Sequence, residues 1–255
     1  MGKELPGDDD PRRSIELLWG QHEPGRRGPK PRFSTADVVL AAIAIADRDG
    51  LAAISMRAVA QSVGVSPMSL YTYVRSKTEL LALMFDQVMG EMQDPPPDLE
   101  WRAALTFMAR ERWRLGLHRP WLLDVAHHRL PLGPNLVARL EGVIRTLDAT
   151  GLPELDKDLV AGVIVNYVRG ALHELREARE AEERSGLTDE QWFSLVEPAL
   201  QTRLDPARRP TLVRLRETWR KARGRANDPT VRFEQGLEVV LDGIEAFIAR
   251  RRSEA

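Results

Sequence analysis

The sequence contains no cysteine, which excludes disulfide bridges, thiolate metal sites, iron–sulfur clusters and cysteine catalysis. It also lacks an apolar run near the roughly 18 residues that cross a bilayer, and its start lacks the apolar stretch of a secretory signal. The net charge is −1, so bulk charge favours neither nucleic acid nor a membrane. These absences predict a globular protein of the cytoplasm with no membrane segment. We expect no cofactor, and the sequence leaves open whether a metal ion assists ligand binding.

The sequence predicts no strands either, because no run of five residues alternates convincingly between apolar and polar side chains. Apolar residues instead recur at helical spacing from Ser34 to the C-terminus, which predicts an all-α fold. The run Asp94-Pro95-Pro96-Pro97-Asp98 stops one helix and marks a domain boundary. We therefore expect an arm over residues 1–33, a helical domain over 34–93 and a second helical domain over 98–255.

The ends of the expected helices can be recognised from capping residues, glycines and prolines. In the first domain a serine can cap each of four helices, over 34–49, 55–63, 66–74 and 76–92. In the second domain we expect helices over 100–117, 120–126, 133–150, 156–184, 189–202, 210–223 and 229–252.

Residues 1–33 are rich in proline and glycine and read as a flexible arm. The end of this arm carries Arg26, Arg27, Lys30 and Arg32 and no acidic residue. Two interpretations remain open for these four residues. They belong to a solvated tail, or they form a basic arm that lies on nucleic acid.

A helix-turn-helix pattern occupies residues 54–77, which read ISMRAVAQSVGVSPMSLYTYVRSK. Two short helices flank Gly64, and Pro67 falls at the first position of the second helix, where its missing N–H costs nothing. The inward-facing set is apolar: Val59, Val63, Val65, Leu70 and Val74. The spacing and turn chemistry predict a DNA-binding helix-turn-helix, although three packed helices without DNA binding give the same pattern.

The second helix of this pattern leaves short, uncharged side chains for its other faces. They are Pro67, Met68, Ser69, Tyr71, Thr72 and Tyr73. Such a surface suits base edges and thymine methyls in a major groove. Arg57, Arg75 and Lys77 surround it and are candidates for phosphate contacts, and the free N–H groups of the helix that Ser66 caps also attract phosphate.

Residues 35–84 resemble the DNA-binding domain of the tetracycline-repressor family of bacterial regulators. The resemblance is carried by AVAQSVGVSPMSLYTYVRSKTELLALM, with the Gly64 turn, the Leu70-Tyr71 pair, Val74 and the continuation from Lys77 to Leu81. It implies a three-helix DNA-binding domain that binds double-stranded operator DNA.

The resemblance also assigns roles by position. It implies DNA contact by Arg57 at the start of the second helix and phosphate contact by Lys77 at the start of the fourth. Contact positions of the recognition helix fall on Met68, Ser69, Tyr71 and Tyr73. Thr72 stands where the tetracycline repressors carry an aromatic residue, so their operator sequence does not transfer to this chain.

Residues 98–255 resemble the regulatory domain of the same family, most closely in FEQGLEVVLDGIEAFI at 233–248. The resemblance implies that this helix and the helix over 156–184 form a four-helix dimer interface with their counterparts. The edge of its apolar stripe is predicted to face the partner: Leu237, Leu241, Ile244 and Ile248. Gly236 and Gly243 would let the partner approach closely. The alternative is that both stripes fill the core of the protomer itself.

The same resemblance implies a ligand cavity at the centre of the regulatory domain. The candidate ligand-binding residues are Trp101, Phe107, Trp113, Trp121, His127, Asn166, Tyr167 and His173. The gathering of aromatic side chains predicts a small ligand that is largely apolar or aromatic. His127 and His128 are adjacent and cannot share a helix face, so no metal pair is expected there.

Together these observations predict a dimeric transcriptional repressor that a small molecule releases from its operator. An all-α enzyme is the alternative of a different class, but the sequence has no catalytic triad, no glycine-rich phosphate loop and no metal-ligand cluster. A second alternative is a regulator that answers to a protein partner without a small-molecule effector.

Overall fold

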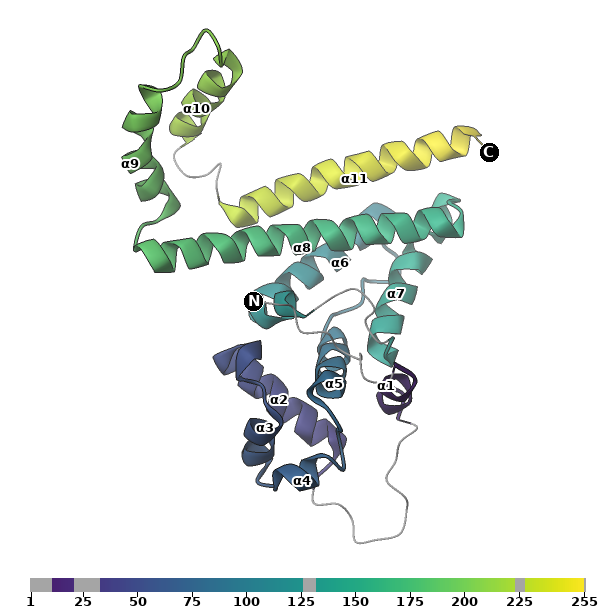
Figure 1. The fold of residues 1–255 in the computed structure, drawn as a ribbon. Coiled ribbons are helices and arrows are strands. Elements are labelled where there is room, and N and C mark those ends of the chain that lie inside the picture. The colour runs from purple at the N-terminus through teal and green to yellow at the C-terminus, as the bar shows by residue number, and fades with distance from the viewer. Residues whose placement is uncertain (1–10, 21–32, 126–131, 223–227, 255) are drawn as a thin grey trace. The chain divides into compact units, whose positions relative to one another are not determined.

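The computed structural model describes residues 11–20, 33–125, 132–222 and 228–254. Within these ranges the chain forms helices joined by turns and no strand, so the all-α prediction is confirmed (Figure 1). None of the helices in these ranges is both long and apolar enough to span a membrane. The chain packs as two compact units, residues 1–162 and 163–255.

The described residues of the first unit form ten helical elements and the start of an eleventh. They are α1 (Pro11–Leu18), α2 (Thr35–Asp49), η1 (Leu51–Ala53), α3 (Met56–Val63), α4 (Pro67–Leu70), α5 (Lys77–Met89), α6 (Trp101–His118), η2 (Pro120–Asp124), α7 (Pro134–Thr146), η3 (Asp148–Thr150) and the first residues of α8 (Glu154–Ser185). The second unit holds the rest of α8, then α9 (Asp189–Gln201), α10 (Pro210–Ala222) and α11 (Pro229–Glu254).

The four helices α2 to α5 begin at the serines that the sequence analysis identified. Ser34 forms a full capping box with Asp37, and that hydrogen bonding holds the pKa of the Asp37 carboxyl below its ordinary value. Ser55 and Ser76 accept hydrogen bonds from the backbone N–H groups three residues on, at the starts of α3 and α5. Gly64 ends α3 in the left-handed region, at φ 73°, where a side chain would be strained.

The core of the first unit continues past the proline run. Val59, Leu70 and Phe85 from α3 to α5 belong to the same buried cluster as Leu115 at the end of α6 and Trp121 in η2. The packing division therefore falls inside α8 and not at residues 94–98. The functional division into residues 34–93 and 98–255 stays a prediction.

The arm over residues 1–33 was expected to be flexible, and for residues 11–20 this prediction is wrong. Residues 11–18 form α1, which packs against α5 and buries Ser14 and Leu18. Arg13 forms an ion pair with Glu79 of α5, with 2.8 Å between Nε and Oε1. Because these partners lie on a distant part of the chain, the local composition of residues 11–20 does not reveal them.

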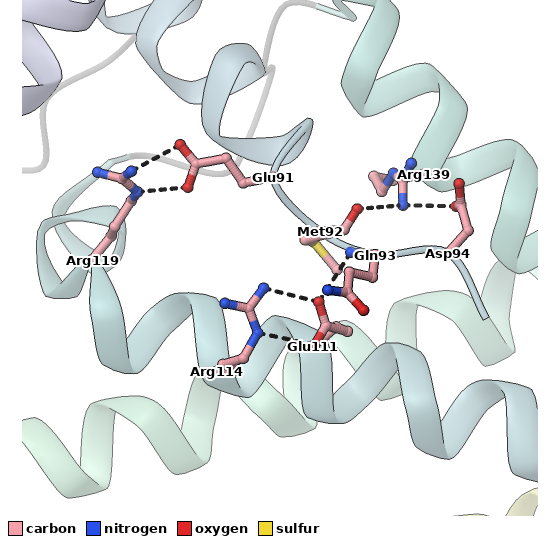
Figure 2. Close-up of polar contacts among 8 residues, drawn as sticks. All are labelled: Glu91, Met92, Gln93, Asp94, Glu111, Arg114, Arg119 and Arg139. Atoms are coloured by element: carbon pink, nitrogen blue, oxygen red, sulfur yellow. Dashed lines mark hydrogen bonds and ion pairs between the residues drawn. The ribbon is translucent and has the colours of Figure 1, made fainter. Parts of the chain in front are cut away.

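The link between α5 and α6 is held by side chains from three neighbouring elements (Figure 2). Arg119, just before η2, pairs with Glu91. Glu111 of α6 accepts a hydrogen bond from the backbone N–H of Gln93 at 3.0 Å. Arg139 of α7 donates to the carbonyl oxygen of Met92 at 3.1 Å and also pairs with Asp94. The proline run thus follows a segment fixed by polar contacts.

In the second unit, α8 and α11 are joined near the start of α11. The Tyr167 hydroxyl donates to the carbonyl oxygen of Phe233 at 2.7 Å, and the two rings stack with centroids 5.9 Å apart. A Cβ on Gly236 would lie 2.3 Å from the Tyr167 hydroxyl oxygen. Gly236 therefore makes room for a side chain of its own protomer, and its predicted use for a partner's approach is wrong.

Candidate DNA-binding surface and regulatory sites

The helix-turn-helix is built from α3, the turn after Gly64 and α4. Ser66 caps α4 by accepting from the backbone N–H of Ser69 at 3.1 Å, and Pro67 occupies its first turn. The α-helix ends at Leu70, earlier than the expected Val74, and residues 71–73 continue as a tight turn. Leu70 and Val74 are fully buried, so this short segment is anchored from behind.

The outward face of α4 carries exposed, uncharged side chains. Met68 is 80% exposed and Tyr71 is 44% exposed. Ser66, Pro67, Ser69 and Thr72 are exposed as well. Tyr73 differs, because its ring is half-buried and packs against the core of the first unit. The structure thus presents together all the predicted base-reading residues except Tyr73, which also supports the fold.

The candidate phosphate contacts lie at the starts of helices. Arg57 is exposed on the first turn of α3, and Arg75 is exposed just before α5. Lys77 is the first residue of α5 and is half-buried. The free N–H groups at such helix starts favour anions. The four basic residues predicted to extend this surface, Arg26, Arg27, Lys30 and Arg32, lie outside the described residues.

Behind this surface, the buried carboxylate of Asp86 on α5 caps another helix. It accepts from the backbone N–H of Leu136 at 2.9 Å and from the Asn135 side chain at 3.1 Å, at the start of α7. No side chain of the α7 start itself serves as cap. A Cβ on Gly133 would lie 2.4 Å from this carboxylate, so the close approach requires glycine. No local pattern in the sequence indicates this contact, because Asp86 and Leu136 lie 50 positions apart.

A second polar contact joins the end of α2 to η2. The Trp121 indole N–H donates to Asp47 at 2.7 Å, and Arg119 pairs with both Asp47 and Glu91. Burial lowers the pKa of the Arg119 guanidinium, but its hydrogen bonds to Glu91 and Asp47 outweigh burial and raise that pKa. Arg119 thus carries a fixed positive charge between the ends of α2 and α5.

The predicted ligand residues occupy several different settings. Trp121 is buried in the core of the first unit and its N–H is already bonded, so its assignment to a ligand is corrected to a structural role. Tyr167 likewise serves the packing of α8 on α11. Trp113 is buried, whereas Trp101 and Phe107 on α6 are half-buried.

The remaining ligand candidates lie on α8 or outside the described chain. Asn166 is exposed, and His173 is half-buried with Arg176 3.2 Å from its Nδ1. His127 lies outside the described residues. Among the residues that the structure does describe, no group of three His, Asp or Glu side chains is placed to hold a metal ion.

The predicted dimer residues are buried within the single chain. Leu237, Leu241, Ile244 and Ile248 are at most 5% exposed. A residue that is already buried in the protomer has no surface left for a partner, so the assignment of these four residues to the dimer face is wrong, and the four-helix interface itself stays a prediction. Val239, on another face of α11, is 72% exposed, and Gly243 has no atom within 4 Å of an added Cβ.

Comparisons with known proteins agree with this architecture. Residues 38–84 match the family of bacterial regulatory proteins described as the tetR family, and residues 94–248 match the tetracyclin repressor-like C-terminal domain. The HTH-type transcriptional repressor DrrR1 of Streptomyces coeruleorubidus is 40% identical over 99% of this chain and 92% of its own length.

Two solved structures of a TetR family protein from Streptomyces coelicolor, ActR, are also similar. ActR in complex with actinorhodin has a TM-score of 0.71 and 29% identity, covering 84% of this chain and 96% of that one. ActR in complex with (S)-DNPA has a TM-score of 0.67 and 28% identity, covering 85% and 98%. The helix-turn-helix, the helical domain that follows it and these likenesses lead to one conclusion: the chain is a DNA-binding transcriptional regulator of the tetR family.

Proposed function

We propose that the chain is a homodimeric repressor that binds operator DNA through α4 and is released by a small apolar or aromatic ligand. The observation that carries the proposal is the exposed, uncharged face of α4, framed by Arg57, Arg75 and Lys77. Exposed apolar side chains such as Met68 are common singly, but here they share one short helix with a tyrosine and hydroxyl groups. Because its partner is chromosomal DNA, the regulator works in the cytoplasm, as a binding protein and not as an enzyme.

We infer a homodimer because one DNA-binding head contacts too little of a symmetric operator. A single head contacts one half-site, and two heads bind successive major grooves roughly 34–36 Å apart. The dimer face that we propose lies on the outer sides of α8 and α11, where Val163, Val231 and Val239 are exposed. Gly170 and Gly243 have open space in front of them, which permits close approach of a partner helix.

The proposed ligand class rests on the aromatic residues of α6 and on the relatives. Trp101, Phe107 and Trp113 supply the apolar surface that small-molecule sites use. The structural relative ActR has been solved with actinorhodin and with (S)-DNPA, and DrrR1 is named a repressor. The proposed release of the operator by a ligand is consistent with both.

A route from the ligand to the DNA is available inside the first unit. The end of α6 leads directly into Arg119 and η2, and Arg119 is bonded to Asp47 on α2 and to Glu91 after α5. A ligand that favours another position of η2 therefore biases the ends of both helices. By linkage, such a ligand changes DNA affinity only as far as its affinity differs between the two positions.

The proposal is tested with DNA fragments selected from a random pool by the full-length protein. We expect a two-fold symmetric operator. A thermal-shift screen should then find an aromatic compound that both stabilises the protein and releases this operator. An asymmetric or absent consensus argues against the repressor. A symmetric operator with release by a protein partner alone argues against the ligand.

A further inference from the structure

Helix α1 lies outside both matched family domains, yet it contacts the first turn of α5, next to the candidate phosphate-binding residues. Arg13 reaches Glu79 on the first turn of α5 at 2.8 Å, and the side chain of Glu79 is only 5% exposed. In Figure 1 the short helix α1 lies beside the N-terminal end of α7. Its packing against α5 is confirmed by the contacts between the two helices.

Glu79 connects α1 to the residues expected to face DNA phosphates. One of its carboxylate oxygens accepts from Arg13, and the other accepts from the backbone N–H of Arg75 at 2.8 Å. The backbone N–H of Glu79 in turn donates to the Ser76 hydroxyl at 3.1 Å. The conformation of residues 75–77, which hold Arg75 and Lys77, therefore depends on a carboxylate whose charge Arg13 balances.

The other end of α1 contacts the segment before α7. The Trp19 indole N–H donates to the carbonyl oxygen of Leu132 at 2.9 Å. Leu132 precedes Gly133, where the Asp86 carboxylate of α5 caps α7. One short helix thus touches both the start of α5 and the chain that enters α7.

We propose that α1 is a positioning strap for DNA binding, in which Arg13 acts through Glu79 to hold residues 75–77 in their DNA-binding conformation. The proposal rests on the operator binding proposed above. Without Arg13 the buried carboxylate loses the ion-pair partner that it has among the described residues, and a buried unpaired charge is costly. The carboxylate then turns toward solvent, and its hydrogen bond to the Arg75 backbone weakens.

The test is a mutant cycle in the full-length protein, with the operator selected by the wild-type chain. We expect Arg13→Ala to weaken operator binding on the order of tenfold, since a charge-assisted hydrogen bond is lost. Arg12→Ala is the matched control, because it removes the same charge from the neighbouring, exposed position. We expect it to leave operator affinity close to the wild-type value.

Rescue by a second substitution tests whether Arg13 acts through the buried charge of Glu79. Glu79→Gln removes the buried charge but keeps an oxygen that can accept from the Arg75 N–H, and glutamine is accepted at this helix position. The double variant Arg13→Ala/Glu79→Gln should therefore bind the operator more tightly than Arg13→Ala alone. Circular dichroism on each variant confirms that the helices are formed at the assay temperature.

Three results overturn the proposal. Arg12→Ala and Arg13→Ala lose operator affinity equally, neither loses affinity, or the double variant does not recover it. If Arg13→Ala does not fold, Arg13→Gln, which keeps a polar side chain of similar length without the charge, replaces it, and wild-type affinity of that variant also overturns the proposal. These outcomes are separate from failure of the proposed function, in which the wild-type chain itself selects no operator.

Discussion

Helices α4 and α5 are neighbours in the chain, yet they differ in how much of each is buried. In α4 only Leu70 is buried, and its other side chains point to solvent. In α5 nine of 13 residues are buried, and two of them are the acidic residues Glu79 and Asp86. The exposed side chains of α4 contribute little to the fold and are free for DNA, whereas α5 fixes where α4 lies.

The two buried acidic residues of α5 show how this helix is fixed in the first unit. Buried carboxylates are tolerated when they are paired or hydrogen-bonded. Glu79 has Arg13 and the Arg75 backbone, and Asp86 has the start of α7. Each of them joins α5 to another part of the first unit, so we expect substitutions on α5 to affect stability and substitutions on α4 to affect recognition.

The largest effect is expected on α11, where a buried and an exposed face can be compared directly. Leu241→Glu places a carboxylate at a site that is 0% exposed, which we expect to cost at least about 4 kcal/mol and to unfold most of the protein. Val239→Glu places the same charge at a site that is 72% exposed, so the protein should fold normally and sediment as a monomer.

Thermal unfolding and analytical ultracentrifugation measure both variants. A folded, dimeric Leu241→Glu protein would contradict the burial of that residue in the protomer. A Val239→Glu protein that remains a dimer would place the dimer face elsewhere.

An intermediate effect is expected at Asp86. Asp86→Ala leaves the N–H groups at the start of α7 without their acceptor, and we expect a loss of about 3 kcal/mol in the free energy of unfolding. Asp86→Asn keeps one acceptor oxygen and serves as the matched control with a smaller loss. Urea unfolding measures both, and equal stability of Asp86→Ala and wild type would argue against the cap.

The sequence predicted the elements whose determinants are local. The serine caps at Ser34, Ser55 and Ser76 and the left-handed turn at Gly64 depend on residues within a few positions of each other. For the same reason the helix-turn-helix was recognised from its spacing and its turn residues. The exposure of Met68 also follows, because the inward set of α4 was identified.

What the sequence did not predict depends on distant partners. Helix α1 is eight residues long and is held by residues of α5, 66 positions away in the case of Arg13 and Glu79. Short helices of this length are marginal without such tertiary contacts. The Asp86 cap likewise joins residues 49 to 50 positions apart.

The assignment of the apolar stripe of α11 to the dimer face was wrong for another reason. Helical periodicity identifies which side chains share a face, but it does not say what covers that face. Leu237 and Leu241 were assigned to a partner by resemblance, and they are buried in the protomer. A tyrosine opposite a glycine, Tyr167 and Gly236, is the kind of packing that only the three-dimensional structure reveals.

Operator reading by α4 is tested most directly by measuring operator and non-specific DNA affinity for Tyr71→Ala, with Lys77→Ala as the comparison. We expect Tyr71→Ala to lose roughly 1–3 kcal/mol of operator binding while non-specific binding and folding are unchanged. Lys77→Ala should weaken all DNA alike and reduce the salt dependence by about one unit of slope. If Tyr71→Ala leaves the ratio of operator to non-specific affinity at the wild-type value, α4 does not read the operator as described.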